Sequence, residues 1–245
     1  MSTLGEPRPR FRYYPLVLGA FVTVLLCSNL IGPGKTCILH LPFSLPWIGA
    51  FLTFGAGNLF FPISYIFDDV LTEVYGYAQA RKVIWAGFGA MIFATLMGWV
   101  VINLPADPNE PFNKVMQPAL ETCFGNTWRI VVASMIAFWA GDFANSYVLA
   151  KMKIWTQGRM LWTRTIGSTI VGEGLDSVIF YPIAFAGIWE AQTLVKVVVF
   201  NWFFKVMFEV VATPVTYLVC GWLKRAEGVD HYDRDTDFSP FSLKD

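Results

Sequence analysis

Long stretches without a charged residue are the strongest constraint on what this chain can fold into. No Asp, Glu, Lys or Arg occurs within residues 13–34, 36–67 or 83–106. Each run exceeds the roughly 20 apolar residues with which a helix crosses about 30 Å of hydrocarbon. Only 15% of the 245 residues are charged, whereas a soluble domain is about one quarter charged. The chain is therefore predicted to be an integral membrane protein.

The second half of the chain is similarly apolar, but single charges interrupt it. Counting both halves predicts an all-α membrane protein with six transmembrane helices in one bundle. The six predicted spans lie near residues 14–31, 47–67, 83–104, 128–150, 165–189 and 195–223. No stretch outside them is long enough for a second domain, so residues 1–245 are interpreted as one domain.

The lysines and arginines are distributed unevenly between the two sides of such a bundle. With the N-terminus in the cytoplasm, the outer side carries Lys35, Lys114 and Arg129, while Lys196 and Lys205 fall at or within the last span. The other 13 of the 18 are cytoplasmic: Arg8, Arg10, Arg12, Arg81, Lys82, Lys151, Lys153, Arg159, Arg164, Lys224, Arg225, Arg234 and Lys244. This asymmetry is the positive-inside pattern, so both termini are expected in the cytoplasm.

Five ionisable side chains are placed inside the predicted spans: Asp142, Glu173, Asp176, Lys205 and Glu209. A charge at mid-bilayer costs about 2.5–3.5 kcal/mol on insertion scales. Five unpaired charges would cost on the order of 15 kcal/mol, which exceeds the stability of a typical domain. We therefore expect these side chains to face one another, water or a ligand.

Helical spacing places these residues on shared faces. Glu173 and Asp176 are three residues apart on the fifth span, and Lys205 and Glu209 are four apart on the sixth. Asn145 lies almost one turn after the aspartate of the fourth span. These positions predict a hydrated substrate-binding pocket inside the bundle. The alternative is that the same groups only join the helices through ion pairs and hydrogen bonds.

A second acidic group lies at the cytoplasmic end of the second span. Asp69 and Glu73 are one helical turn apart, Asp68 precedes them, and Arg81 and Lys82 follow. We interpret Asp69 and Glu73 as a gating or coupling element that forms a salt bridge with the basic residues. A solvated helix end is the alternative.

The cysteines and the net charge limit the choice of ligands. Cys27 and Cys220 fall inside predicted spans, while Cys37 and Cys123 fall in outer loops, where pairing is left open. The spacing of the four cysteines along the chain is not typical of a metal site. The formal net charge is zero, so we expect no nucleic-acid partner, and nothing in the sequence indicates a cofactor.

Three stretches resemble a known family. They are DVLTEVYGYAQARKVIW (69–85), FANSYVLAKMKIWTQGRMLWTRTIGSTIVGEGLDSVIF (143–180) and KVMFEVVATPVTYLV (205–219). Together they resemble the vitamin uptake transporter (VUT) family of queuosine precursor transporters. The resemblance covers nearly the whole chain after the first dozen residues. The first aspartate motif of the family usually reads Ser-Asp, and here Asp68 replaces the serine.

The resemblance implies a multi-pass transporter of the cell inner membrane. It would import 7-deazaguanines, namely 7-cyano-7-deazaguanine (preQ0) and 7-aminomethyl-7-deazaguanine (preQ1), for salvage into tRNA queuosine. It would act as a stand-alone secondary carrier and not as an enzyme.

The predicted pocket suits such a base because a carboxylate accepts hydrogen bonds from a ring N–H and an amine together. Glu173 is the first candidate for this contact and Asp176 the second, with Asn145 or Lys205 donating to the carbonyl.

Two other classes of protein compete with a carrier. The stretch GEGLDS (172–177) is superficially similar to the Gly-Asp motifs of intramembrane aspartyl hydrolases, with Asp142 and Asp176 as the two aspartates. The other local patterns of those enzymes are absent. A non-transporting assembly subunit is the second alternative. The sequence leaves open the preferred precursor, the energy coupling and the oligomeric state, monomer or homodimer.

Overall fold

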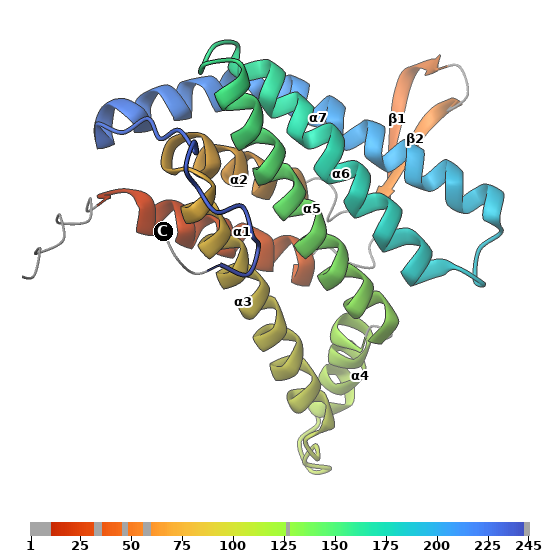
Figure 1. The fold of residues 1–245 in the computed structure, drawn as a ribbon. Helices are drawn as coiled ribbons and strands as arrows, with labels where there is room; N and C mark the ends of the chain where they lie inside the picture. The colour runs from red at the N-terminus through yellow and green to blue at the C-terminus, as the bar shows by residue number, and fades with distance from the viewer. Residues whose placement is uncertain (1–10, 32–35, 46–48, 56–59, 126–127, 243–245) are drawn as a thin grey trace, which may run out of the picture.

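The structure, a computed structural model, describes residues 11–31, 36–45, 49–55, 60–125 and 128–242. Within these residues the chain forms a helical bundle with one antiparallel β-hairpin (Figure 1). The elements are α1 (Tyr14–Ile31), β1 (Thr36–Leu45), β2 (Gly49–Gly55), α2 (Phe61–Tyr75), α3 (Tyr77–Asn103), α4 (Asn113–Phe124), α5 (Trp128–Trp155), α6 (Leu161–Phe185) and α7 (Ala191–Glu227). The predicted all-α class is confirmed, with the hairpin as a small addition.

The second predicted span, 47–67, is wrong as a single helix. Residues 49–55 form strand β2, which pairs with β1 in the register Cys37 opposite Phe54, and helix α2 begins only at Phe61. The start of that predicted span, at Trp47, lies outside the described residues. A short apolar run fits a strand as well as a helix, and hydropathy alone does not separate the two.

The other five predicted spans each coincide with a helix. The first matches α1 at both ends, and α3, α5 and α7 extend past the predicted limits by several residues at one end or both. Helix α6 begins four residues before its predicted span and also ends four residues before it. Helix α4 was not predicted. It lies beside the last turns of α3, where Gln117 Nε2 donates to the carbonyl of Ile102 at 3.0 Å, and the two helices form an arm that projects from the bundle (Figure 1).

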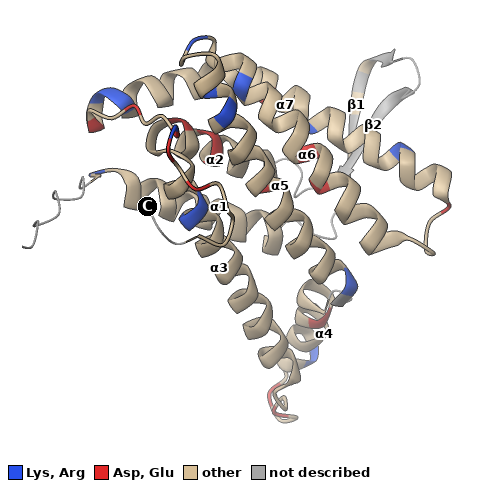
Figure 2. Ribbon diagram, in the orientation of Figure 1, with Lys and Arg blue, Asp and Glu red and all other residues tan. Residues whose placement is uncertain are grey.

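Much of the helical surface is apolar. Long parts of α1, α3 and α5 carry no charge, and charged residues gather at helix ends and around α2 (Figure 2). Among the described residues, α1 and α3 are long and apolar enough to cross a membrane by length and composition. The other long helices carry charged side chains within their length, and Asp142, Glu173, Asp176, Lys205 and Glu209 among them are buried inside the bundle.

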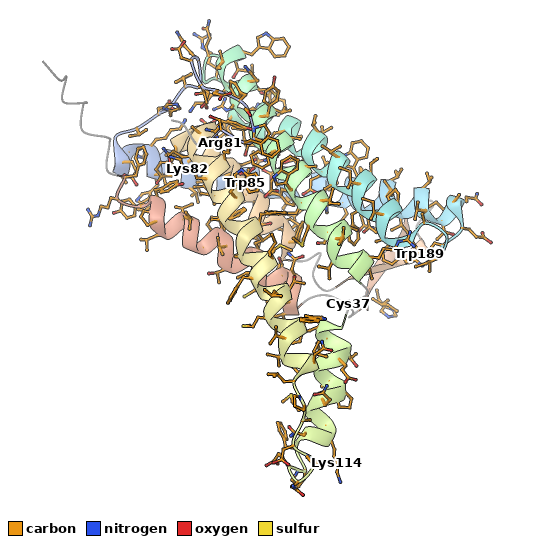
Figure 3. All side chains as sticks on the ribbon, turned by 60° about the horizontal axis from the view of Figure 1, so that its bottom comes forward. Cys37, Arg81, Lys82, Trp85, Lys114 and Trp189 are labelled. Carbon is orange, nitrogen blue, oxygen red and sulfur yellow. The ribbon has the colours of Figure 1, made fainter. Side chains whose placement is uncertain are left out.

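Several helix ends meet at one end of the molecule. The carboxylate of Glu227, at the end of α7, accepts hydrogen bonds from the backbone N–H groups of Arg12 and Tyr13, at the start of α1. It also accepts one from the hydroxyl of Tyr75, the last residue of α2, at 2.9 Å. Arg81, Lys82 and Trp85 lie at this end, whereas Lys114 lies at the tip of the arm (Figure 3).

Two glycines let α5 and α6 approach each other closely. A Cβ atom added at Gly172 would lie 2.8 Å from the Cβ of Asn145 and 2.9 Å from the carbonyl oxygen of Gly141. A Cβ added at Gly141 would lie 3.1 Å from the Cβ of Asp176. Small residues at such crossings are typical of helix packing in membranes. This contact brings the polar faces of α5 and α6 together.

A glycine also separates α2 from α3. Gly76 has a φ of +85°, a backbone conformation that residues with a Cβ rarely adopt. The N–H of Tyr77, at the start of α3, donates to both carboxylate oxygens of Asp233 at 3.1 Å each. A carboxylate at a helix N-terminus is favourable because the exposed N–H groups carry partial positive charge.

Asp233 belongs to a segment, residues 229–242, that follows α7 and crosses the ends of α3 and α5; we call it the C-terminal strap (Figure 1). Arg81 Nη1 donates to the carbonyls of Asp237 and Ser239 at 2.7 and 2.8 Å. Trp85 Nε1 donates to the carbonyl of Pro240 at 2.8 Å. The strap therefore fixes the start of α3 to the rest of the bundle.

Candidate functional site

Lys205 of α7 lies between two carboxylates of α6. Its ammonium nitrogen is 2.6 Å from Oε2 of Glu173 and 2.6 Å from Oδ2 of Asp176. The same nitrogen lies 5.3 Å from the ring centroid of Phe61 and 5.7 Å from that of Tyr65, both on α2. The three predicted residues Glu173, Asp176 and Lys205 are thus brought together and buried.

Asn145 of α5 points to a different partner, the paired aspartates of α2. Its side-chain nitrogen donates to Oδ1 of Asp69 at 2.6 Å and to Oδ2 of Asp68 at 3.1 Å. Ser146 also donates to Asp68, at 2.8 Å, and Thr72 donates to Ser146 at 3.0 Å. Asp68 and Asp69 are therefore part of the buried polar centre of the bundle and do not form a solvated helix end.

Glu73 lies in a separate ion cluster, one helical turn beyond Asp69. Arg164 of α6 binds it in a fork, with Nε 2.7 Å from Oε2 and Nη2 2.8 Å from Oε1. Lys224 of α7 contacts the same carboxylate, and Lys153 of α5 lies 3.5 Å from it. The predicted salt-bridge partners of Glu73 were Arg81 and Lys82. Arg164, Lys153 and Lys224 take that place because α5, α6 and α7 bring them to this end of the bundle.

The strap completes this ion cluster through Asp230. Its carboxylate lies 2.6 Å from Lys153 Nζ and 2.8 Å from Lys224 Nζ. Partial burial raises the pKa of Asp230, but hydrogen bonds from these two ammonium groups outweigh that effect and hold the pKa below its ordinary value of 3.8. Asp230 therefore stays ionised at neutral pH and joins α5 to α7.

A cleft of about 210 Å³ opens beside the ion cluster. It is lined by Glu73, Gly158, Met160, Leu161, Arg164, Tyr217, Cys220, Gly221 and Lys224. These residues come from the end of α2, the α5–α6 connection, the start of α6 and the last turns of α7. The cleft thus lies at the end of the molecule where the helix ends meet.

The polar centre contains more carboxyl groups than cations. Lys205 is the buried cation that contacts this centre, through Glu173 and Asp176. Among the described residues six carboxyl groups of the centre are buried: Asp68, Asp69, Asp142, Glu173, Asp176 and Glu209. Five unmatched carboxylates would cost on the order of 15 kcal/mol in lipid, more than a typical domain's stability. Protonated carboxyls, water or a ligand with hydrogen-bond donors must account for this excess.

Several buried atoms of this centre have no hydrogen-bond partner among the described residues. They include Oδ2 of Asp69, Oδ2 of Asp142, Oδ1 of Asn145, Oε1 of Glu209 and the hydroxyl of Tyr65. Four of the five are acceptor oxygens of carboxyl or amide groups. The centre is therefore suited to a ligand that presents several N–H groups.

The comparisons with known proteins agree with this chemistry. A family model described as "Putative vitamin uptake transporter" matches residues 55–219. The chain belongs to this family. The matched region contains all six carboxyl groups of the polar centre, together with Glu73, Arg164 and Lys205.

Two curated relatives carry more specific names. The chain is 33% identical over 168 residues to a "Probable queuosine precursor transporter" of Bacillus subtilis, covering 68% of this chain and 71% of that protein. It is 26% identical over 178 residues to a "Queuosine precursor transporter" of Escherichia coli, covering 71% and 74%. No solved structure matches the fold. Membership of a transporter family makes this a membrane protein that moves a small molecule.

The sequence did not identify Arg164, Lys153 or Lys224 as partners of Glu73. Arg164 carried one detectable signal, since it stands in the resembling stretch WTRTIGSTIVGEGLDS. The four cysteines are all free thiols in this structure, so Cys37 and Cys123 do not pair here. Among the described residues no three His, Cys, Asp or Glu side chains converge in a way that would hold a metal ion.

Proposed function

We propose that this chain is an uptake carrier of the cell inner membrane for 7-deazaguanine queuosine precursors, preQ0 and preQ1. The observation that carries the proposal is the buried polar centre with its excess of acceptor oxygens. The names of the two relatives support the substrate class. A 7-deazaguanine presents a ring N–H and an amine side by side, and these donors match carboxylate acceptors.

In the proposed topology six helices cross the membrane, and both termini lie in the cytoplasm. The contacts of Glu227 place the start of α1, the end of α2 and the end of α7 together. The contacts of Glu73 add the end of α5 and the start of α6. Helix starts and helix ends thus alternate along the chain at this end of the molecule. This arrangement supports membrane crossings by α1, α2, α3, α5, α6 and α7. In Figure 3 Arg81 and Lys82 lie at the opposite end of the molecule from Lys114, as the proposed positive-inside topology requires.

Substrate recognition is assigned to the α5–α6–α7 face of the centre. Glu173 and Asp176 are the proposed acceptors for the donor edge of the base, and substrate would compete with Lys205 for them. Oδ2 of Asp142 has no hydrogen-bond partner among the described residues, and Asp142 lies near enough to this pair for all three carboxyl groups to act on one another. Lys205, once displaced, or Asn145 donates to the carbonyl of the base. The rings of Phe61 and Tyr65 lie nearby and suit stacking on a base.

The test of this function is uptake by cells that cannot make the precursor. Glu173→Gln keeps the shape of the side chain but replaces an acceptor oxygen with a donor, so uptake of both precursors should fall to background. Glu190→Gln is the matched control, because Glu190 is exposed in the α6–α7 connection and should leave uptake unchanged. Normal uptake by Glu173→Gln at equal membrane abundance would remove Glu173 from the site.

Two alternatives are separated by binding and cleavage measurements on purified protein. An intramembrane hydrolase using Asp142 and Asp176 would cleave members of a peptide panel, whereas a carrier leaves them intact. A non-transporting assembly subunit would not be stabilised by preQ0 or preQ1. A carrier would show a rise in Tm that grows with ligand concentration, because only the folded protein binds the base. Mass measurement in detergent would decide between a monomer and a homodimer.

A further inference from the structure

Two buried carboxyl groups on different helices form a pair that no lysine or arginine contacts among the described residues. Asp69 of α2 is 0% exposed and Glu209 of α7 is 2% exposed. One oxygen of each, Oδ2 of Asp69 and Oε1 of Glu209, is buried without a hydrogen-bond partner. We infer that Asp69 and Glu209 form the binding site for a proton that crosses the membrane with the substrate. This inference rests on the proposed transport function and reassigns Glu209 from substrate contact to coupling.

The groups that face the pair are acidic or neutral, with the exception of Lys205. Helices α2 and α7 pack against each other, and Glu209 is the charged group that acts most strongly on the carboxyl of Asp69. Asn145 of α5 donates to Asp69, and Asp68 and Glu73 of its own helix also act on it. Glu209 also acts electrostatically on Glu173 of α6.

The one cation on the same helix face is Lys205, four residues before Glu209, and it is held by Glu173 and Asp176. On the other side, one turn beyond Asp69, the cations Arg164, Lys153 and Lys224 lie against Glu73. Two buried carboxylates that act on each other without a cation of their own do not both stay ionised, so one of the two retains a proton.

A row of small polar side chains lies on the α7 face between this pair and the cleft. On α7 the buried residues after Glu209 include Thr213, Thr216 and Cys220, which share its helix face, and Cys220 lines the cleft. On α2, Glu73 follows Asp69 by one turn and also lines the cleft. Hydroxyl groups and a carboxylate are suitable steps for proton transfer, whereas an apolar row would block it.

The geometry favours a proton over a metal ion. Metal ions such as Na⁺ or Ca²⁺ require several oxygen ligands around one point, and no three acidic, His or Cys side chains converge in this way among the described residues. A proton needs only one carboxylate oxygen and is held well between two. Loading therefore converts one carboxylate of the pair to a carboxylic acid, and its release to the cytoplasmic cleft restores the charge.

The coupling role is tested in liposomes that contain the purified carrier and labelled preQ1. A gradient of one pH unit, acidic outside, should raise accumulation by wild type about tenfold at one proton per substrate, since a pH unit is a tenfold ratio of proton activity. Glu209→Gln and Asp69→Asn should still bind preQ1 and exchange it but should lose this accumulation. Glu190→Gln, on the exposed α6–α7 connection, should accumulate like wild type.

Three results would overturn the inference: accumulation by wild type that ignores the pH gradient, accumulation driven by a Na⁺ gradient instead, or full pH-driven accumulation by both variants. Failure of wild type to bind or exchange preQ1 would instead count against the proposed substrate.

If wild type neither binds nor exchanges preQ1, infrared spectroscopy of the reconstituted protein still tests whether Asp69 and Glu209 hold a proton. Wild type and Glu190→Gln should show a titrating buried carboxylic acid band that Glu209→Gln or Asp69→Asn removes. Retention of the band in both variants would overturn the site.

Discussion

The close approach of α5 and α6 predicts a large effect from one added methyl group. In Gly172→Ala the new Cβ would lie 2.8 Å from the Cβ of Asn145 and 2.9 Å from the carbonyl of Gly141. Ordinary carbon contacts are about 3.6 Å, so the helices must separate by roughly 0.8 Å. Asn145 also donates to Asp69 of α2 at 2.6 Å, so a shift of this size at Asn145 disturbs that hydrogen bond as well.

The expected loss follows from these distances. Overpacking of a closely packed contact costs about 1–3 kcal/mol, which corresponds to a fall in Tm of about 2–12 °C for a chain of this length. Because the polar centre is displaced, uptake of preQ1 should fall more than abundance in the membrane does. Thermal unfolding in detergent and uptake in precursor-deficient cells are the two measurements.

Two matched variants test whether the loss depends on the space available for the added Cβ. Gly141→Ala meets atoms at 3.1 Å and should lie between Gly172→Ala and wild type. Gly89→Ala on α3 meets no atom within 4 Å and should be neutral or stabilising by about 0.5–1 kcal/mol, because alanine is the better helix former. The reasoning is refuted if Gly172→Ala and Gly89→Ala have the same Tm and the same uptake.

Three further substitutions test the end of the bundle where the helix ends meet. Arg164→Lys keeps the charge but loses the fork on Glu73, and thermal unfolding should show a loss of about 1–3 kcal/mol; an unchanged Tm would contradict the role of the fork. Gly76→Ala forces a φ of +85° on alanine and places its Cβ 2.2 Å from His231, so protease should cut the strap faster than in wild type. Hydrogen bonds from His231, the Tyr77 N–H and Thr236 outweigh burial and hold the pKa of Asp233 below 3.8. Its stabilisation is therefore present above about pH 3.8 and is lost as the pH falls through the lower folded pKa, so wild type and Asp233→Asn should differ in Tm at neutral pH and converge in acid.

The sequence was sufficient where one physical property decides the structure. The apolar run of residues 14–31 coincides with α1, because no charge or proline interrupts it after the first turn. The run at 47–67 failed because apolar composition fits a β-hairpin equally well. The end of α2 was also missed: a rule that stops each span at the first charge cannot anticipate that Asp68, Asp69 and Glu73 continue the helix while buried.

Contacts between residues distant in sequence were the second feature that could not be predicted from the sequence. The i, i+3 spacing of Glu173 and Asp176 was enough to predict a shared face, and Lys205 meets both. No spacing rule links Glu73 to Arg164, 91 residues later, or Asn145 to Asp69. These contacts depend on how α2, α5 and α6 cross, which only the three-dimensional structure shows.

The C-terminal strap has a consequence for the order in which the protein is made. The ribosome delivers residues 229–242 after every helix that they join, so α3 is made before Asp233 is available to its first N–H groups. Until then the start of α3 and the Lys153–Lys224 contact lack their last carboxylates. Assembly of this end is therefore a post-insertion step, and a bulky fusion placed within the strap should impair maturation more than one placed before α1.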